Sequence, residues 1–269
     1  GRADPALALV NWRSLAAADL VLFNSRFHRD GLMAALPGFL TRHTDERHVA
    51  HVEAVAARSE VLPVGVDLSR LSPERRSASG GGPAGNGPPL VVWNHRWEWD
   101  KQPAEALRLL AGQMERGVDL RVALAGESPG HLPRELEEAV AALGDRVVHR
   151  GFLPRDEYLD LLLAADIVLS TAVQEFFGVA VVEAVAAGCV PVLPDDLAYP
   201  EVVPQPWHAV ALHDRHGSGP ADHLHRALSD LPAARARVVG LDRAMRRFDW
   251  SVVAPAYDER LARLASTGG

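Results

Sequence analysis

Cysteine is almost absent from this sequence: Cys189 is the only one in 269 residues, so no disulfide bond can form within the chain. Chains without disulfides are typical of reducing compartments, and we expect a cytoplasmic protein. No apolar run reaches the roughly 18 residues that a membrane-spanning helix requires, and no leader with a cleavage site is recognisable. The formal net charge of −7 argues against a strongly basic nucleic-acid surface, although a local basic patch is compatible with it.

Lysine is equally scarce. Of the 28 Lys and Arg residues, Lys101 is the only lysine, and all the others are arginine. Lys101 follows Arg96 by five residues, on a loop that we expect at the end of a strand. Lysine supplies a compact point charge and arginine a planar fork, and a pyrophosphate can use both at once. We interpret the pair as candidate diphosphate ligands, with a chance surface lysine as the alternative.

The sequence also lacks an Asp-x-Asp triplet, which weighs against a nucleotide-sugar enzyme that depends on a divalent cation. Asp195 and Asp196 are adjacent and do not form such a triplet. The histidines fall in polar segments without a cysteine or a tight carboxylate partner, and we interpret them as solvated side chains. We therefore expect no metal site at either group: His43, His48 and His51, or His208, His213, His216, His223 and His225.

Strands and helices alternate regularly in the second part of the chain. The apolar periodicity predicts strands at 90–93, 120–125, 146–149, 167–170 and 190–193. The intervening helices are expected at 103–116, 133–143 and 154–165. Five strands in alternation with helices predict an α/β fold with a doubly wound parallel sheet, in which ligands bind beyond the carboxyl ends of the strands.

The first part of the chain shows the same alternation but is shorter. Helices are expected at 5–18, 26–36 and 43–57, with Asn24-Ser25 capping the second, and strands at 19–23 and 60–63. Two strands are too few for a stable sheet domain, and the chain begins with Gly1 rather than Met. We therefore expect that an upstream portion of this lobe is missing.

Residues 72–89 are rich in Gly, Pro and Ser and cannot build a core, which predicts a flexible linker between two lobes. The resulting division is a partial N-terminal lobe at 1–72, a linker at 73–89, a C-terminal domain at 90–248 and a C-terminal segment at 249–269. Further helices are expected at 221–230, 233–248 and 251–265. The last of these can pack back on the first lobe.

Residues 174–194 are the most informative stretch. A loop narrows at Gly178, a helix with apolar positions follows, and the chain continues after Gly188 as a short strand. A helix that begins at a glycine offers backbone N–H groups and a positive dipole end to an anion. Glu183 lies about 7.5 Å further along the helix axis, roughly the distance from a phosphate to the ribose of the same nucleotide. The alternative is an ordinary α/β helix with a solvated glutamate.

Two pairs of residues together resemble the sequence motifs of a known family. Arg96 with Lys101, and Glu175 with Glu183 in an E-x7-E arrangement that runs into Gly188, are similar to the retaining GT-B glycosyltransferases of the GT4 type. Residues 58–71 resemble the end of that family's first domain. Closer still, residues 93–103 (WNHRWEWDKQP), 124–127, 151–158, 165–189 and 195–201 resemble the tRNA-queuosine α-mannosyltransferase branch.

The resemblance implies a GT-B-like fold of two Rossmann-like lobes and a retaining transfer of a hexose. The donor would be a nucleotide sugar, GDP-mannose, bound without a metal or other cofactor, and the acceptor would be queuosine in tRNA. Two alternatives stay open: a GT4 enzyme of polysaccharide or glycolipid synthesis, and a non-catalytic nucleotide-binding module. A glycosidase is less consistent with one glutamate on a loop, the other in a helix and a cationic pair beside them.

The resemblance also implies roles for individual residues. Arg96 and Lys101 would stabilise the departing diphosphate, Glu175 would hold the transferred sugar, and these three are the expected catalytic residues. Glu183 would bind the ribose. The further donor contacts implied are Asn94, His95, Gly126, Glu127, Gly151, Phe152, Phe176, Phe177, Gly178 and Val179. Trp97 and Trp99 could line the pocket or pack against the linker, and the sequence leaves both open.

Overall fold

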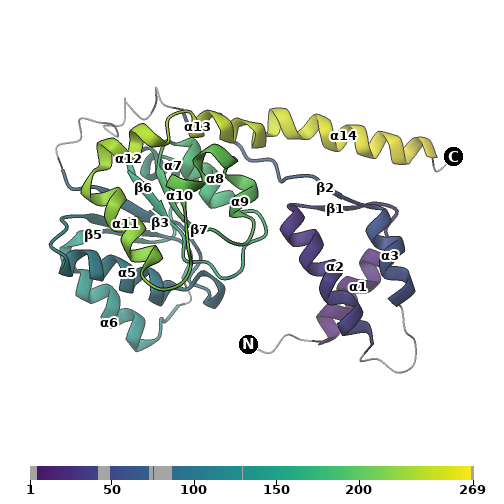
Figure 1. The fold of residues 1–269 in the computed structure, drawn as a ribbon, viewed down its shortest axis with the longest axis horizontal. Coiled ribbons are helices and arrows are strands. Elements are labelled where there is room, and N and C mark those ends of the chain that lie inside the picture. The colour runs from purple at the N-terminus through teal and green to yellow at the C-terminus, as the bar shows by residue number, and fades with distance from the viewer. Residues whose placement is uncertain (1–4, 42–48, 73–74, 76–86, 129, 268–269) are drawn as a thin grey trace. The chain divides into compact units, whose positions relative to one another are not determined.

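The computed structural model describes residues 5–41, 49–72, 75, 87–128 and 130–267. The chain forms two compact units (Figure 1). The first contains Gly1–Val64 and Ser251–Gly269, and the second contains Gly65–Trp250. No helix among the described residues combines the length and the apolar character needed to cross a lipid bilayer.

The described residues of the first unit form a pair of parallel strands and four helices. β1 (Val21–Phe23) pairs with β2 (Ser59–Val61), and Trp12, Phe23 and Leu40 are buried in its core. The predicted cap is confirmed, because the Ser25 hydroxyl accepts a hydrogen bond from the His28 N–H at 3.1 Å. The helices are α1 (Pro5–Ala17), α2 (Arg26–Leu40), α3 (Val49–Ala57) and the last helix α14 (Trp250–Thr267).

Two helices of this unit differ from the expectation in their extent. α2 continues to Leu40 through Pro37, whereas the sequence predicted an end at residue 36. The predicted start of the third helix, at residue 43, lies outside the described residues. In α14 the Arg260 guanidinium donates to the Glu60 carboxylate at 2.9 Å, which joins this helix to β2.

The second unit contains a six-stranded parallel sheet in the order β5-β4-β3-β6-β7-β8. Its strands are β3 (Leu90–Trp93), β4 (Arg121–Ala125), β5 (Val147–Gly151), β6 (Ile167–Leu169), β7 (Val190–Pro194) and β8 (Leu212–His213). The five predicted strands are all present. β8 was not predicted, because two residues in a histidine-rich segment carry no readable periodicity. Numbered from β3, the order is 3-2-1-4-5-6, the arrangement of dinucleotide-binding folds.

Helices cover both faces of this sheet (Figure 1). One apolar core joins α5 (Pro103–Glu115), α6 (Arg134–Leu143) and α11 (Gly219–Ser229) to the strands. α7 (Arg155–Ala164) and α8 (Val179–Ala186) contact one another and begin at the end of the sheet where the strands terminate. The short elements are η1 (Trp99–Lys101), η2 (Gly144–Arg146), α9 (Tyr199–Val202), η3 (Gln205–Trp207), α10 (His208–Ala211), α12 (Leu231–Arg237), α13 (Leu241–Ala244) and η4 (Met245–Phe248).

Two expectations for the C-terminal part of this unit are wrong. The single helix expected at 233–248 is interrupted, because Gly240 has a φ of 85° and ends the helical path before α13. His213 and His223, expected to be solvated, are only 7% and 5% exposed, and their rings lie 5.7 Å apart. They are buried because β8 and α11 pack onto β7.

The start of the second unit is fixed by contacts with residues near 250. Val66 forms a parallel bridge with Asp249, whose carboxylate accepts from the Leu68 N–H at 3.1 Å. Gly65 faces the indole of Trp250 so closely that a Cβ there would lie 2.3 Å from the ring. Residues 65–71 therefore belong to the second unit, while composition alone places them before the linker. Most of the expected linker, 73–74 and 76–86, lies outside the described residues.

Candidate active site

The winding of the sheet changes direction between β3 and β6, which are neighbours in the sheet but not in the sequence. The chain leaves β3 into residues 94–102 and leaves β6 into residues 170–178, which lead into α8. At such a switch point the two connections run to opposite sides and leave a crevice beyond the strand ends. The predicted site residues follow these two strands and the neighbouring β4 and β5.

A pocket of about 320 Å³ opens at the ends of β3, β4 and β5. Five of the predicted site residues line it, four of them donor contacts and the fifth Arg96. Phe152, 74% exposed, offers an aromatic face at this position. Arg96 is exposed, and its side chain forms no ion pair or hydrogen bond with any described residue. The lining residues are Asn94, His95, Arg96, Ala125, Gly126, Phe152, Leu153, Arg155 and Tyr158.

The strand-end loops around this pocket touch through their backbones. A Cβ on Gly126 would lie 1.9 Å from the His95 carbonyl oxygen, so only glycine fits here. The Gly126 N–H donates to the Gly151 carbonyl at 2.9 Å, and the Trp97 N–H donates to the Glu127 carbonyl at 3.0 Å. Gly126, Glu127 and Gly151, all predicted as donor contacts, thus hold the three loops together.

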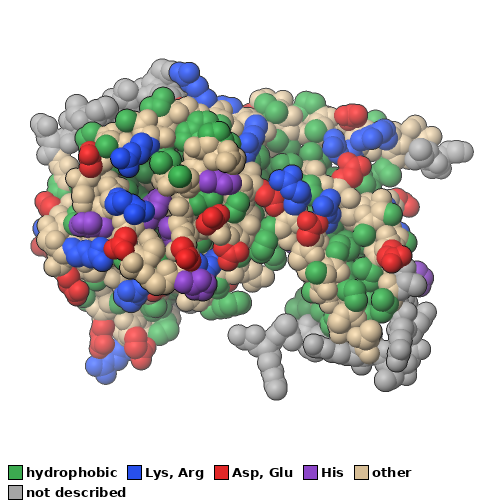
Figure 2. Space-filling view, viewed as in Figure 1, with side chains coloured by type: hydrophobic (Ala, Val, Ile, Leu, Met, Phe, Trp, Pro, Cys, Tyr) green, Lys and Arg blue, Asp and Glu red, His purple; other side chains and the backbone are tan. Residues whose placement is uncertain are grey.

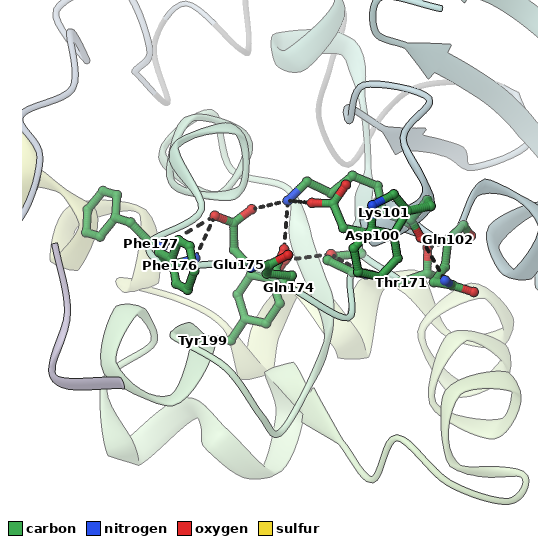
Figure 3. A network of polar contacts seen from close by, with 12 residues as sticks. Asp100, Lys101, Gln102, Thr171, Gln174, Glu175, Phe176, Phe177 and Tyr199 are labelled. Atoms are coloured by element: carbon green, nitrogen blue, oxygen red, sulfur yellow. Dashed lines mark hydrogen bonds and ion pairs between the residues drawn. The ribbon is translucent and has the colours of Figure 1, made fainter. Parts of the chain in front are cut away.

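Lys101 connects η1 to the loop that precedes α8 (Figure 3). Its ammonium donates to the Gln174 carbonyl at 2.8 Å and to the Glu175 carboxylate at 3.1 Å. Asp100 places a second carboxylate oxygen 3.1 Å away. The lysine side chain is 11% exposed. The tertiary structure therefore brings the lysine to the loop before α8, as the sequence predicted, and adds Asp100, which the sequence analysis did not single out.

Glu175 also binds the backbone of its own loop. Its second carboxylate oxygen accepts from the Phe176 and Phe177 N–H groups at 3.1 and 3.3 Å (Figure 3). Gly178, with a φ of 94°, then turns the chain into α8. The Phe177 side chain is 4% exposed and packs edge-on against Phe248, so only its backbone is available to a ligand.

Glu183 lies one turn into α8 and is 6% exposed, which excludes the interpretation as a solvated glutamate. The Arg155 guanidinium lies 2.6 Å from one of its oxygens, and the Tyr158 hydroxyl donates to the other at 3.1 Å. Burial raises the pKa of Glu183, while Arg155 and Tyr158 act in the opposite direction. Arg155 and Tyr158 were missed in the sequence, although both lie in the helix after a strand-end loop.

Asn94 holds Tyr158 in place. Its amide nitrogen donates to the Tyr158 hydroxyl at 3.0 Å and to the Ala180 carbonyl at 2.8 Å. Its amide oxygen is buried and has no hydrogen-bond partner among the described residues. Burial, followed by the nearby Glu183 charge, raises the pKa of Tyr158, which therefore stays protonated and remains a donor to Glu183.

His95 lines the pocket and is also close enough to Lys101 and its two carboxylates to interact with their charges. Burial lowers the pKa of His95 to about 4, with Glu175, Lys101 and Asp100 as the nearby charges. Its ring packs against Trp93, and its Nε2 is buried without a partner among the described residues. The imidazole is therefore neutral at pH 7.

The two tryptophans that the sequence left open have different environments. Trp97 is 5% exposed and packs edge-on against Trp93 in the core. The Arg150 guanidinium lies 5.7 Å from its ring centroid. Trp99 is 62% exposed on η1.

Within the described ranges, no three His, Cys, Asp or Glu side chains are placed to share a metal ion.

Comparison with solved structures defines the fold. The chain superposes on sucrose-phosphate synthase from Thermosynechococcus elongatus with a TM-score of 0.75 at 22% identity, covering 99% of this chain and 63% of that one. It matches the Anabaena protein Alr3699/HepE in complex with UDP-glucose with a TM-score of 0.70 at 20% identity, covering 97% and 68%. The fold is that of the GT-B glycosyltransferases, as predicted.

Two segments of the chain match known protein families. Residues 77–233 match the family described as glycosyl transferases group 1, and the chain belongs to that family. Residues 2–66 match the N-terminal family of the tRNA-queuosine alpha-mannosyltransferases. Both matches confirm the predicted resemblance.

Named relatives agree with this assignment. The Drosophila melanogaster tRNA-queuosine alpha-mannosyltransferase is 39% identical over 196 residues, 71% of this chain and 52% of that protein. The Xanthomonas campestris GDP-mannose:cellobiosyl-diphosphopolyprenol alpha-mannosyltransferase is 25% identical over 217 residues, 78% of this chain and 54% of that protein. The chain thus spans about half the length of these relatives.

Proposed function

We propose that this chain is the donor-binding portion of a retaining mannosyltransferase that transfers mannose from GDP-mannose to queuosine in tRNA. The placement of the donor diphosphate rests on one geometric observation: Lys101 meets the loop before α8 at the switch point of the sheet. GDP-mannose as the donor is supported by the Xanthomonas relative, which is named for it. The acceptor assignment is supported by the similarity to the Drosophila enzyme and to its N-terminal family.

In this proposal the protein mainly stabilises the leaving group. The bond between the anomeric carbon and the diphosphate breaks, and the acceptor hydroxyl attacks from the same face. Its proton passes to the departing phosphate oxygen. Arg96 and Lys101 neutralise the growing negative charge, and Glu175 accepts hydroxyl protons of the sugar in hydrogen bonds. No side-chain nucleophile is required.

Glu183 binds the ribose and Phe152 faces the base. A carboxylate accepts hydrogen bonds from a diol, and Arg155 counteracts the burial that raises the pKa of this carboxylate. The exposed ring of Phe152 offers a stacking surface on the same pocket that Arg96 lines.

Calorimetry tests the donor. We expect GDP-mannose to bind more tightly than UDP-glucose or ADP-glucose, with the same affinity in the presence of a chelator. Loss of binding on chelation would contradict the metal-free proposal, and preference for UDP-glucose would contradict the guanine assignment.

The acceptor is tested with tRNA that contains or lacks queuosine, using a protein that spans the full length of the Drosophila relative. We expect labelled mannose on the queuosine-containing tRNA alone, and equal labelling of both would contradict the proposal. Figure 2 shows acidic and basic side chains interleaved on one face of the second unit. Binding of tRNA phosphates would then depend on local clusters of arginine side chains. The salt dependence of the tRNA affinity would measure how many phosphates are neutralised.

Two alternatives have their own tests. The Xanthomonas relative is named for a polyprenol-linked acceptor, so labelling of such a lipid rather than tRNA would favour a role in polysaccharide synthesis. A non-catalytic nucleotide-binding module is distinguished by Arg96→Ala. In an enzyme this change lowers turnover far more than donor affinity, whereas a binding module has no turnover to lose.

A further inference from the structure

One carboxylate holds the hydrogen-bond donors at the start of α8. One oxygen of Glu175 lies 3.1 Å from the Lys101 ammonium. The other oxygen accepts from the Phe176 and Phe177 N–H groups (Figure 3). An ammonium and two adjacent N–H groups are the donors with which proteins bind phosphate. In this structure the chain's own glutamate occupies them.

The charges around Lys101 make this site unfavourable for a further anion. Asp100 and Glu175 both lie 3.1 Å from the ammonium, so two carboxylates face one cation. Their side chains are 17% and 18% exposed, and solvent screening is correspondingly reduced. A diphosphate that used Lys101 and these N–H groups would have to displace the Glu175 carboxylate.

The backbone of residues 171–178 is held in place, so the Glu175 side chain is the part that can move. The Thr171 hydroxyl donates to the Lys101 carbonyl at 2.8 Å, and the Val173 N–H donates to the Asp100 carbonyl at 2.7 Å. A Cβ on Gly178 would lie 3.3 Å from the Tyr199 ring and 3.6 Å from the Glu175 side chain. The loop is thus held from both ends around the glutamate.

We propose that Glu175 determines specificity for the nucleotide sugar over the free nucleoside diphosphate. This inference rests on the proposed function. Either ligand displaces the carboxylate from its donors, but only the nucleotide sugar supplies hydroxyl groups that hydrogen-bond to it afterwards. With the bare diphosphate, a poorly solvated carboxylate is left beside phosphate oxygens without a partner, which is unfavourable. After transfer, return of Glu175 to Lys101 favours release of the diphosphate.

The test compares GDP and GDP-mannose binding by calorimetry in the wild-type chain and in Glu175→Gln, which keeps the shape and removes the charge. We expect Glu175→Gln to bind GDP about fivefold more tightly than wild type, the equivalent of losing one partly screened charge repulsion. We expect the preference for GDP-mannose over GDP to fall. Glu175→Ala should likewise raise the affinity for GDP and lower the preference for GDP-mannose over GDP.

Asp100→Asn is the matched control. It removes the other carboxylate from Lys101, but Asp100 accepts from neither the Phe176 nor the Phe177 N–H. We expect it to strengthen binding of both ligands alike and to leave their ratio unchanged. Circular dichroism melting confirms that each variant is folded.

The outcomes separate this inference from the proposed function. If both ligands bind wild type and Glu175→Gln binds GDP no more tightly, or keeps the same ratio, the displacement role is wrong and the donor assignment stands. If the wild-type chain binds no nucleotide among GDP, UDP, ADP and their sugars, the proposed function is wrong, and this inference with it.

Discussion

The Arg155 guanidinium lies 2.6 Å from the Glu183 carboxylate, and the two residues come from consecutive helices, α7 and α8, of the second unit. The glutamate side chain is 8% exposed, whereas the arginine side chain is 46% exposed. The pair therefore consists of a buried acceptor, Glu183, and a counter-charge, Arg155, that lines the pocket. This arrangement suits a ligand that offers a diol to the carboxylate.

Arg155→Ala should weaken GDP binding about tenfold, because the buried carboxylate loses its counter-charge. The pKa of Glu183, already raised by burial, should rise further, so that GDP affinity falls as the pH is lowered toward 5. Calorimetry at several pH values measures both effects. The control is Arg70→Ala, which removes the more exposed ion pair of Arg70 with Asp156. An unchanged affinity in Arg155→Ala would show that Glu183 does not contact the nucleotide.

Tyr158→Phe keeps the ring and removes the hydroxyl that links Asn94 to Glu183. We expect a loss of about 1 kcal/mol in the free energy of unfolding, the usual effect of one hydrogen bond. We also expect a loss of a few-fold in GDP affinity, because the carboxylate is less well oriented. Urea unfolding and calorimetry measure these changes. Tyr257→Phe removes a hydroxyl of the first unit that donates to the Leu62 and Pro63 carbonyls at 3.5 and 3.4 Å, and it should leave GDP affinity unchanged.

Gly126→Ala should destabilise the second unit by about 2 kcal/mol or more, because the added methyl group would lie 1.9 Å from the His95 carbonyl. Since the same loop lines the pocket, nucleotide binding should be lost as well. Gly112→Ala in α5, where nothing lies within 4 Å of the added Cβ, is the control. It should stabilise the helix by up to about 1 kcal/mol. Equal effects of the two substitutions would contradict the packing argument.

Acid should destabilise the second unit through its buried histidines. Burial lowers the pKa of His95 and of His223 to about 4, from 6.5 in the unfolded chain. The unfolded state therefore binds more protons between these values. Stability is fully present above pH 6.5 and is lost progressively as the pH falls toward 4. The Arg226 guanidinium contacts Nδ1 of His223 at 3.3 Å, so protonation there breaks a hydrogen bond.

Urea unfolding at pH 7.5, 6.5, 5.5 and 4.5 measures this dependence. His223→Gln should reduce the loss of stability between pH 6.5 and 4.5, and substitution of the exposed His216 by Gln is the control. The same pH dependence in wild type and His223→Gln would contradict the assignment to this residue.

The regular elements of the second unit could be predicted from the sequence because their signals are local. The strands from β3 to β7 and the helices α5 to α8 have apolar periodicities that are legible without any partner. β8 and the break at Gly240 depend on packing rather than on periodicity: two residues pair with the end of β7, and one glycine takes a left-handed conformation.

The approach of Lys101 to Glu175 was foreseeable, since both follow adjacent parallel strands whose carboxyl ends meet at one edge. The pairing of Arg155 with Glu183 was not, because no spacing encodes which helix faces which across the end of a sheet.

By itself, the sequence determined the alternating α/β pattern, the family and the set of candidate ligands, because periodicity and motifs are properties of neighbouring residues. Only the tertiary structure decided which of these side chains contact one another. It placed one carboxylate, Glu175, on the lysine and on the N–H groups of its own loop, and another, Glu183, against an arginine from a different helix. Such contacts depend on where burial leaves charged groups close together, and that is settled only when the helices pack onto the sheet.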